Sequence, residues 1–279
     1  MKKIFAGSLP ILVFFTMISN ALGVEYQSAR TLALGGAGRA GPFLTDAIYL
    51  NPSFASYTPI YTLSGGYNSF QSGRNYNFSV QDSRSEFLQA GAGFTKREQN
   101  LAVNIGASKA FAKRYGVGVA TKLILDNGTN HMTSDFLVSG SILATSWLYA
   151  TVVVDNLVAN TAQTSRNLDR TAYVALKLIA AHKIEFYLDP FYSPAYSHGN
   201  KAGYSAGIEI GMLEDLYLRM GKYQDAEVTH LNTRGNGFGL GLGWIGPKLN
   251  LEYAMNRTLS SHAGNALTTS HSTGATIYF

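Results

Sequence analysis

Three glycines near the N-terminus have a spacing that can bind phosphate. Gly36, Gly38 and Gly41 satisfy the pattern G-x-G-x-x-G. This pattern cradles a pyrophosphate only when a strand precedes it and a helix follows it within a parallel βαβ unit. No such unit follows here, and the segment comes soon after an apolar N-terminus. We therefore expect no nucleotide, and no other cofactor, at these glycines.

The histidines and serines suggest neither a catalytic nor a metal centre. The six histidines include no close metal-ligand pair and no H-E-x-x-H motif. Ser260, Ser261 and His262 are neighbours, but hydrolysis also needs a third group that orients the base. The chain has no cysteine, which excludes disulfides and thiolate metal sites. We expect no enzymatic activity and no bound metal.

Charged residues occur within segments in which apolar and small residues alternate. They fall in phase with the small residues, so they face away from the apolar side chains. Their mixed signs argue against a strongly ion-selective pore. They fit either ion pairs with another segment, for which Arg39 and Asp46 are candidates, or simple solvation of a lumen. The predicted lumen-facing charges are Lys122, Asp155, Lys177, Glu185, Glu209, Arg219, Lys248 and Glu252.

These charges lie on segments whose apolar residues have a period of two. From Ala202 to Met212 every second residue is apolar, and from Phe238 to Trp244 the apolar residues alternate with glycines. Such alternation is typical of strands with one apolar and one polar face. A soluble sandwich points the apolar face into a shared core, whereas a membrane barrel points it at lipid. Alternation alone does not separate the two.

Composition, connection lengths and the C-terminus favour the barrel. Only 14% of the 279 residues are charged, against about 25% in soluble domains. Short connections such as 245–248 alternate with longer ones such as 156–169 and 224–235, as periplasmic turns alternate with outer loops. The chain ends on Ile277 and Phe279, which share one face and resemble the terminal signal read by outer-membrane assembly machinery.

The sequence therefore predicts an all-β protein, a membrane-spanning antiparallel barrel over residues 60–279. Many segments approach the ~9–11 residues of a tilted membrane strand, and bacterial barrels have even strand numbers. We expect about 14 strands, near Ile60–Asn68, Tyr76–Gln81, Phe87–Thr95, Leu101–Phe111, Tyr115–Leu125, Asp135–Ala144, Leu148–Asp155, Arg170–Ile179, Ile184–Pro190, Lys201–Met212, Leu216–Tyr223, Asn236–Trp244, Leu249–Asn256 and Ser270–Phe279.

Residues 1–23 have the features of a secretory signal peptide. Lys2 and Lys3 precede a mostly apolar run over residues 4–18, and Ala21 and Gly23 suit signal peptidase. The alternative, a membrane anchor, is disfavoured because the run is shorter than the ~20 residues of a spanning helix. Two of the basic residues behind the formal charge of +5 belong to this signal. The mature chain is therefore too weakly basic to indicate nucleic-acid binding.

Residues 24–59 do not alternate and carry a recognisable run of small residues. The run resembles the N-terminal signature of the FadL and PorV-like superfamily of outer-membrane proteins, in which Gly-Gly-Ala is followed by Asp with small residues and then by Asn-Pro-Ala. Ser53 replaces the usual Ala, and a single Asp is present. Val152 to Leu157 and Leu249 to Ala254 also resemble strands of that superfamily. The matching N-terminal motif comprises Gly35, Gly36, Ala37, Gly38, Asp46, Asn51 and Pro52.

The resemblance implies a 14-stranded barrel in the bacterial outer membrane, with residues 24–59 folded into the lumen as a hatch. Roughly 14 strands enclose a lumen wider than side chains alone can fill. The alternative for this segment is a disordered periplasmic tail.

Two functions are compatible with the resemblance. One is passive uptake of small hydrophobic molecules. The other is a non-transporting barrel that anchors or assembles secreted or surface partner proteins. A lateral opening or a continuous apolar path would favour the first, and a sealed lumen the second. The expected partners are outer-membrane lipids, the barrel assembly machinery, and either a small hydrophobic ligand or a surface protein.

Overall fold

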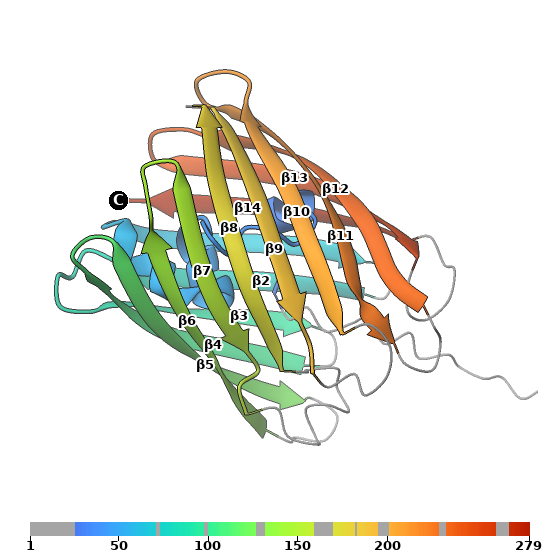
Figure 1. Cartoon of the computed structure of the whole chain (residues 1–279), viewed down its shortest axis with the longest axis horizontal. Coiled ribbons are helices and arrows are strands. Elements are labelled where there is room, and N and C mark those ends of the chain that lie inside the picture. Colours follow the sequence, from blue (N-terminus) through green and yellow to red (C-terminus); the bar gives the residue numbers. More distant parts are fainter. Residues whose placement is uncertain are drawn as a thin grey trace, which may run out of the picture.

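The protein forms a closed antiparallel β-barrel (Figure 1). The computed structural model describes residues 26–70, 73–97, 100–126, 132–158, 170–181, 183–194, 201–228, 233–260 and 268–279. The predicted signal peptide, residues 1–23, lies outside the described residues. Each strand pairs with its neighbours in the sequence, and β1 pairs with β14 to close the barrel.

Within this part of the chain the barrel has fourteen strands, and the predicted fold class is confirmed. The strands are β1 (Tyr61–Phe70), β2 (Gly73–Asp82), β3 (Gln89–Arg97), β4 (Asn100–Phe111), β5 (Tyr115–Asp126), β6 (Met132–Leu143), β7 (Leu148–Asp155), β8 (Thr171–Ala181), β9 (Ile184–Tyr192), β10 (Ala202–Gly211), β11 (Leu216–Val228), β12 (Thr233–Ile245), β13 (Leu249–Ser260) and β14 (Thr268–Tyr278).

The two ends of the barrel differ in the length of their connections. At the end that carries the C-terminus, the strands are joined by short turns such as 112–114 and 246–248 (Figure 1). At the opposite end the connections reach 156–170 and 193–201. Short turns mark the periplasmic end of bacterial barrels. We therefore call the opposite end the outer end.

The outer ends of several strands extend further than the sequence predicts. Residues 224–235 were expected to form a loop, but β11 continues to Val228 and β12 begins at Thr233. In the strand register, the backbone of Glu227 lies opposite that of Arg234, after a bulge in β11. These outer segments are polar and lack alternation, so strand pairing rather than patterning determines where they end. The connections 71–72 and 98–99 at the outer end are as short as the periplasmic turns.

The two faces of the wall follow the predicted alternation. Leu240 and Leu251 point outward and are 40% and 47% exposed, as expected for side chains that contact lipid. Glu209 and Arg219 point into the lumen and are buried. Since a shift of one residue would exchange the faces of a strand, the register of these strands agrees with the sequence pattern.

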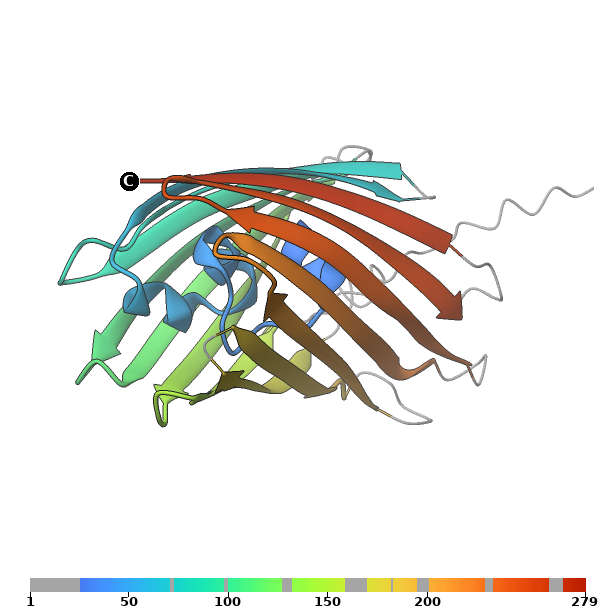
Figure 2. The same ribbon diagram turned by 90° about the horizontal axis from the view of Figure 1, so that it is seen from above.

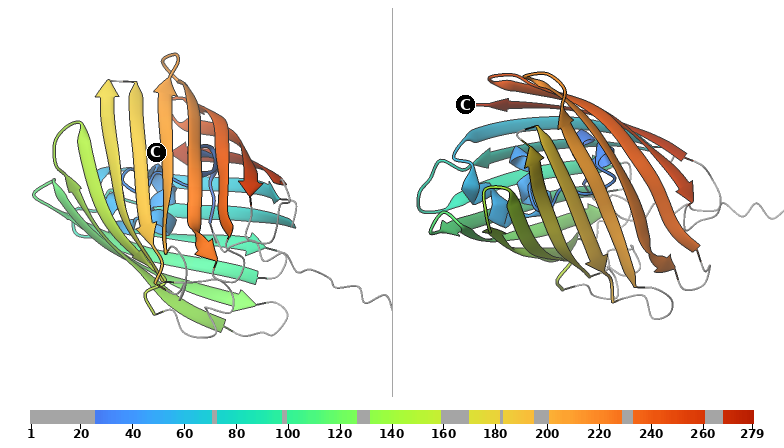
Figure 3. Two further views of the ribbon diagram at one scale, coloured as in Figure 1. Left: turned by 45° about the vertical axis from the view of Figure 1, so that its right-hand side comes forward. Right: turned by 45° about the horizontal axis from the view of Figure 1, so that its top comes forward.

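The N-terminal segment lies inside the barrel. Its helices are α1 (Ala29–Ala33), η1 (Leu44–Asp46), α2 (Ala47–Leu50) and η2 (Pro52–Tyr57), and strands surround them on all sides in Figures 2 and 3. The helix α1 packs against β11 to β14, and η2 packs against β4 to β6. Within the described residues, no helix is long and apolar enough to cross a bilayer. We call residues 26–59 the hatch.

Candidate functional site

The hatch can lie against the wall because glycines line the wall where its backbone passes. A Cβ atom at Gly118 would lie 2.5 Å from the carbonyl carbon of Pro52. A Cβ atom at Gly239 would lie 2.7 Å from the carbonyl oxygen of Ala33 and closer still to that of Leu32. The glycines that alternate with apolar residues in β12 therefore give the hatch backbone space to approach.

Because the hatch backbone packs so closely, a single methyl group added to a wall glycine should displace it. We expect Gly239→Ala to displace α1, because the new Cβ would overlap two carbonyl oxygens of the hatch. Gly274→Ala is the matched control, since a Cβ on Gly274 would have no atom nearer than 3.9 Å. Limited proteolysis of folded protein in detergent should cleave the hatch faster in the first variant than in the second. Equal cleavage rates would contradict the close approach.

Several residues of the predicted hatch motif shape its backbone. Gly35, Gly36 and Gly38 have φ values of 65°, 87° and 124°, which glycine adopts without the strain that a Cβ imposes. Ala37 is fully buried against Leu34 and Tyr187. These residues form a tight turn in the middle of the lumen.

The second half of the motif fixes the hatch to β6 and β7. The side-chain Nδ2 of Asn51 donates to Ser141 and Thr151 at 3.0 Å each, and to the carbonyl oxygen of Arg39 at 2.7 Å. Pro52 begins η2, where the missing N–H has no helical partner to lose. Asn51 therefore joins the two halves of the hatch to each other and to the wall.

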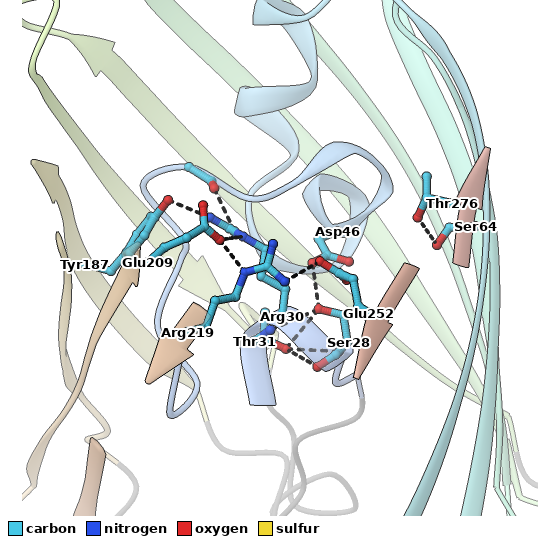
Figure 4. A network of polar contacts seen from close by, with 11 residues as sticks. Ser28, Arg30, Thr31, Asp46, Ser64, Tyr187, Glu209, Arg219, Glu252 and Thr276 are labelled. Carbon is cyan, nitrogen blue, oxygen red and sulfur yellow. Dashed lines mark hydrogen bonds and ion pairs between the residues drawn. The ribbon is translucent and has the colours of Figure 1, made fainter. Parts of the chain in front are cut away.

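Asp46 is held within the hatch rather than by the wall. It accepts a hydrogen bond from the Tyr26 phenol. It also accepts one at 2.7 Å from the Ser28 hydroxyl, which Figure 4 shows. Burial raises the pKa of Asp46 to about 6, and these two hydrogen bonds only partly offset the loss of hydration. A cavity of about 20 Å³ lies beside it, between the hatch and β1, β2, β13 and β14. That space fits about one water molecule.

A buried network of charges joins α1 to the wall (Figure 4). The Arg30 Nε lies 3.1 Å from Glu209 Oε2, and Arg30 also donates to the Tyr187 hydroxyl at 2.6 Å. Arg219 pairs with the same Glu209 and, at 2.7 Å, with Glu252. The acids and bases alternate in this chain of contacts, so each buried charge faces an opposite one.

Removing Arg219 should strongly destabilise the protein. The Arg219→Ala variant leaves Glu252 buried without its cation, which typically costs about 3–5 kcal/mol. Arg84→Ala is the control, because the Arg84–Asp82 pair is exposed and such pairs contribute little. Urea unfolding of folded protein in lipid vesicles should show the loss for Arg219 only. A similar, small change in both variants would show that the network is dispensable.

Of the other predicted lumen charges, four form two further ion pairs, and Lys248 is the exception. Lys177 lies 2.8 Å from Glu185, and Lys122 lies 2.5 Å from Asp155. Lys248 does not face the lumen. It is exposed in the turn between β12 and β13, because β12 ends at Ile245 and the alternation that placed Lys248 on a strand begins only at Leu249.

The sequence analysis does not predict three residues that join the hatch to the wall, namely Asp189 and Tyr187 of the wall and Arg30 of the hatch. Asp189 is fully buried in β9, where its Oδ2 accepts from the backbone N–H groups of Gly38 and Arg39 at 3.0 and 2.9 Å. Tyr187 and Arg30 belong to the charge network. The phase of β9 would have found Asp189 and Tyr187, since both alternate in step with Glu185. No sequence signal distinguished Arg30.

The pairing of β8 with β9 is weakened next to Asp189, with the same register on both sides. Val174 and Ala175 of β8 have no paired residues in β9, although pairing continues on both sides of them. Pro190 lies in the facing part of β9 and has no N–H to donate to the ladder. The neighbouring pair, β9 with β10, stays continuous through this point.

The hatch covers this part of the wall from inside. The Arg39 guanidinium lies 3.7 Å from the centre of the Tyr173 ring, and its Nη1 lies 3.7 Å from Asp189. Beyond Tyr173, an apolar cluster of Ala120, Leu137 and Val153 lines the lumen face of β5 to β7. This apolar cluster is buried, and Tyr173 connects it to the weakened part of the ladder, where Arg39 lies.

A serine motif in β10 does not have the backbone geometry of a hydrolase nucleophile. Gly203, Ser205 and Gly207 match the pattern G-x-S-x-G, which in hydrolases places the serine on a sharp turn between a strand and a helix. Here Ser205 lies in the middle of β10. Among the described residues, no group of three His, Cys, Asp or Glu side chains is placed to hold a metal.

The comparisons with known proteins concern the fold. No protein-family model and no curated protein matches the sequence. Among solved structures, the monoaromatic hydrocarbon channel CymD matches with a TM-score of 0.72 at 10% identity, over 93% of this chain and 99% of that chain. The Ralstonia pickettii toluene transporter TbuX matches with 0.70 at 10% identity, over 92% and 99%. The Pseudomonas putida toluene transporter TodX matches with 0.60 at 11% identity, over 90% and 97%.

These matches cover nearly the whole chain. The predicted resemblance to FadL-like proteins is confirmed at the level of the fold. The protein therefore has the fold of these channels, a closed β-barrel of fourteen described strands with a hatch in its lumen.

Proposed function

We propose that the protein is a hatch-gated channel for the passive uptake of small hydrophobic molecules. The observation that carries this proposal is the buried apolar cluster on the lumen side of β5 to β8, which adjoins the weakened pairing of β8 with β9. A polar solute would gain nothing from such a surface, whereas an apolar solute would bind it by leaving water. The likeness to the fold of hydrocarbon channels supports the same solute class.

The gate in this proposal is the turn from Gly38 to Gly41. Arg39 joins this turn to Asp189 and Tyr173, beside the weakened pairing at Val174. Movement of the turn would uncover Tyr173, the apolar cluster behind it and this part of β8. The glycines allow that movement at low cost, because their backbone is not confined by a side chain.

Uptake of toluene by intact cells tests the proposal. Cells that express the protein should take up labelled toluene several-fold faster than cells that lack it. Arg39→Ala should raise the rate further, because the turn loses its ion pair and its contact with the Tyr173 ring. Arg84→Ala, which removes an exposed arginine outside the lumen, should leave the rate unchanged. If the protein does not change toluene uptake, the transport proposal fails.

The second candidate is a barrel that anchors or assembles surface partner proteins without transport. The close packing of the hatch favours it, because Leu34 and Asn51 are fully buried and the cavity beside Asp46 holds only about one water. Uptake equal to that of cells without the protein would support this function. In that case the outer connections, rather than the lumen, would be the place to seek a partner.

We also propose that the last strand carries the signal for barrel assembly. Ile277 and Phe279 point outward and are 45% and 64% exposed. The Phe279 N–H donates to the Tyr61 carbonyl oxygen at 3.0 Å, which helps to join the first strand to the last. The terminal aromatic residue therefore lies at the seam that must close during assembly.

A further inference from the structure

One side of the outer wall carries basic side chains near the outer end. Arg74 of β2, Lys96 of β3, Arg257 of β13 and His271 of β14 are all exposed. Each alternates with buried lumen residues, so each points outward, toward the membrane. We call these four residues the basic sector.

The strand register brings the basic sector together. His271 is the partner of Ser69 in β1, and Ser69 is the partner of Arg74 in β2. Lys96 lies one strand further, opposite Tyr76. Since neighbouring strands are about 4.8 Å apart, these side chains form a band across adjacent strands. Figure 2 shows β1 and β2 beside β13 and β14 on one side of the barrel.

These cations lack acidic partners. In the described part of the chain, Arg74, Lys96 and Arg257 have no ion pair. The outward faces of β13, β14, β1, β2 and β3 carry a single described acid, Asp82, which lies at the periplasmic end and pairs with Arg84. By contrast, the outward faces of β5 to β10 carry no charged residue among the positions described. Lys222 of β11 and Lys109 of β4 also point outward, so the outward positive charge is concentrated on the side of the wall from β11 through β14 and β1 to β4.

The position along the strands places this charge at the membrane surface. Arg74 lies eight residues from Asp82 along β2, on the side of the outer end. His271 likewise lies eight residues from Phe279, which follows β14 at the periplasmic end. Eight residues of a tilted strand rise roughly 20 Å along the membrane normal. The apolar band of a membrane barrel is about 25 Å tall, so this rise places the basic residues close to its outer edge. Long basic side chains extend from there beyond the band, toward the headgroups.

Aromatic side chains mark the same level. The rings of Tyr67 and Tyr76 lie 5.2 Å apart on the outward faces of β1 and β2. The Tyr253 hydroxyl lies 2.9 Å from the ring nitrogen Nδ1 of His271. Girdles of aromatic residues occur where barrels cross the membrane interface. The basic sector therefore lies at the depth of the headgroups in the outer leaflet.

We propose that the basic sector binds the phosphate groups of an anionic lipid in the outer leaflet. Arginine and lysine bind phosphate through charge-assisted hydrogen bonds. Four basic side chains on neighbouring strands, with no described acid beside them, complement a headgroup with more than one phosphate. The site lies on the outside of the wall, so it is independent of the lumen and of the proposed transport.

Lipid binding by the folded, full-length protein tests the proposal. Native mass spectrometry would compare lipid A, which carries two phosphates, with the same lipid after its phosphates are removed. We expect the unchanged protein to retain lipid A at least tenfold more strongly. Equal retention of both lipids would overturn the proposal, and this comparison needs no variant to fold.

A charge-matched pair of variants then locates the site. The variant with Arg74→Gln, Lys96→Gln and Arg257→Gln should lose the preference for lipid A. The control carries Lys109→Gln, Lys113→Gln and Lys183→Gln at the periplasmic end, and it should keep the preference. Equal loss in both would show that total charge, not this sector, attracts the lipid, and would also overturn the proposal.

Discussion

Deletion of residues 35–53 is expected to convert the closed barrel into an open pore. This segment contains the central turn, the helices η1 and α2 and the start of η2, and its residues Ala37, Ile48 and Asn51 are almost fully buried. Fourteen strands enclose more space than the wall side chains can fill. Single-channel recordings in planar bilayers should therefore show a large, steady conductance that the intact protein lacks.

The deletion leaves the wall itself in place. The ladder of strand pairs from β1 to β14 contains no residue of the hatch. The variant should therefore still show the heat-modifiable gel mobility of a folded barrel. Conductance equal to that of the intact protein, in a variant that passes this check, would mean that the hatch does not limit the pore.

The barrel could be predicted because the residue pattern that indicates a strand lies within each strand itself. Each strand repeats apolar and small residues with a period of two, as in Phe238 to Trp244, and this pattern alone fixes which side chains contact lipid. The outer ends of β11 and β12 were missed because polar residues there pair across the strands without alternating. In those segments the partner strand, rather than the residue pattern, decides the conformation.

The candidate site was only partly predictable, because its contacts join distant parts of the chain. The phase of a strand places Glu209 and Arg219 in the lumen, but it does not show that Arg30 completes their network. Asp46 is one of two candidates for an ion pair with the wall in the sequence analysis, but in the structure it accepts hydrogen bonds from Tyr26 and Ser28 of the hatch. The hatch has no period, so its pairings follow from packing inside the lumen.

A reversible lock of the hatch would decide whether its movement is needed for uptake. A Cβ atom at Gly36 would lie 3.9 Å from the Cβ atom of Ser205 in β10, which is within the usual range for a disulfide. Because the φ of 87° at Gly36 strains any side chain, the single variant Gly36→Cys measures the effect of that strain alone. The chain contains no cysteine. The double variant Gly36→Cys and Ser205→Cys therefore has one possible disulfide, and a reductant removes it.

The central claim is that small hydrophobic molecules pass only when the hatch moves away from the wall. Toluene uptake should be measured in cells that express the double variant, first oxidised and then after reduction, with each single-cysteine variant as control. The account predicts that oxidation lowers uptake at least tenfold, to the level of cells without the protein, and that reduction restores it. Equal uptake by the oxidised and reduced double variant, with the disulfide verified by mass spectrometry, would contradict the claim.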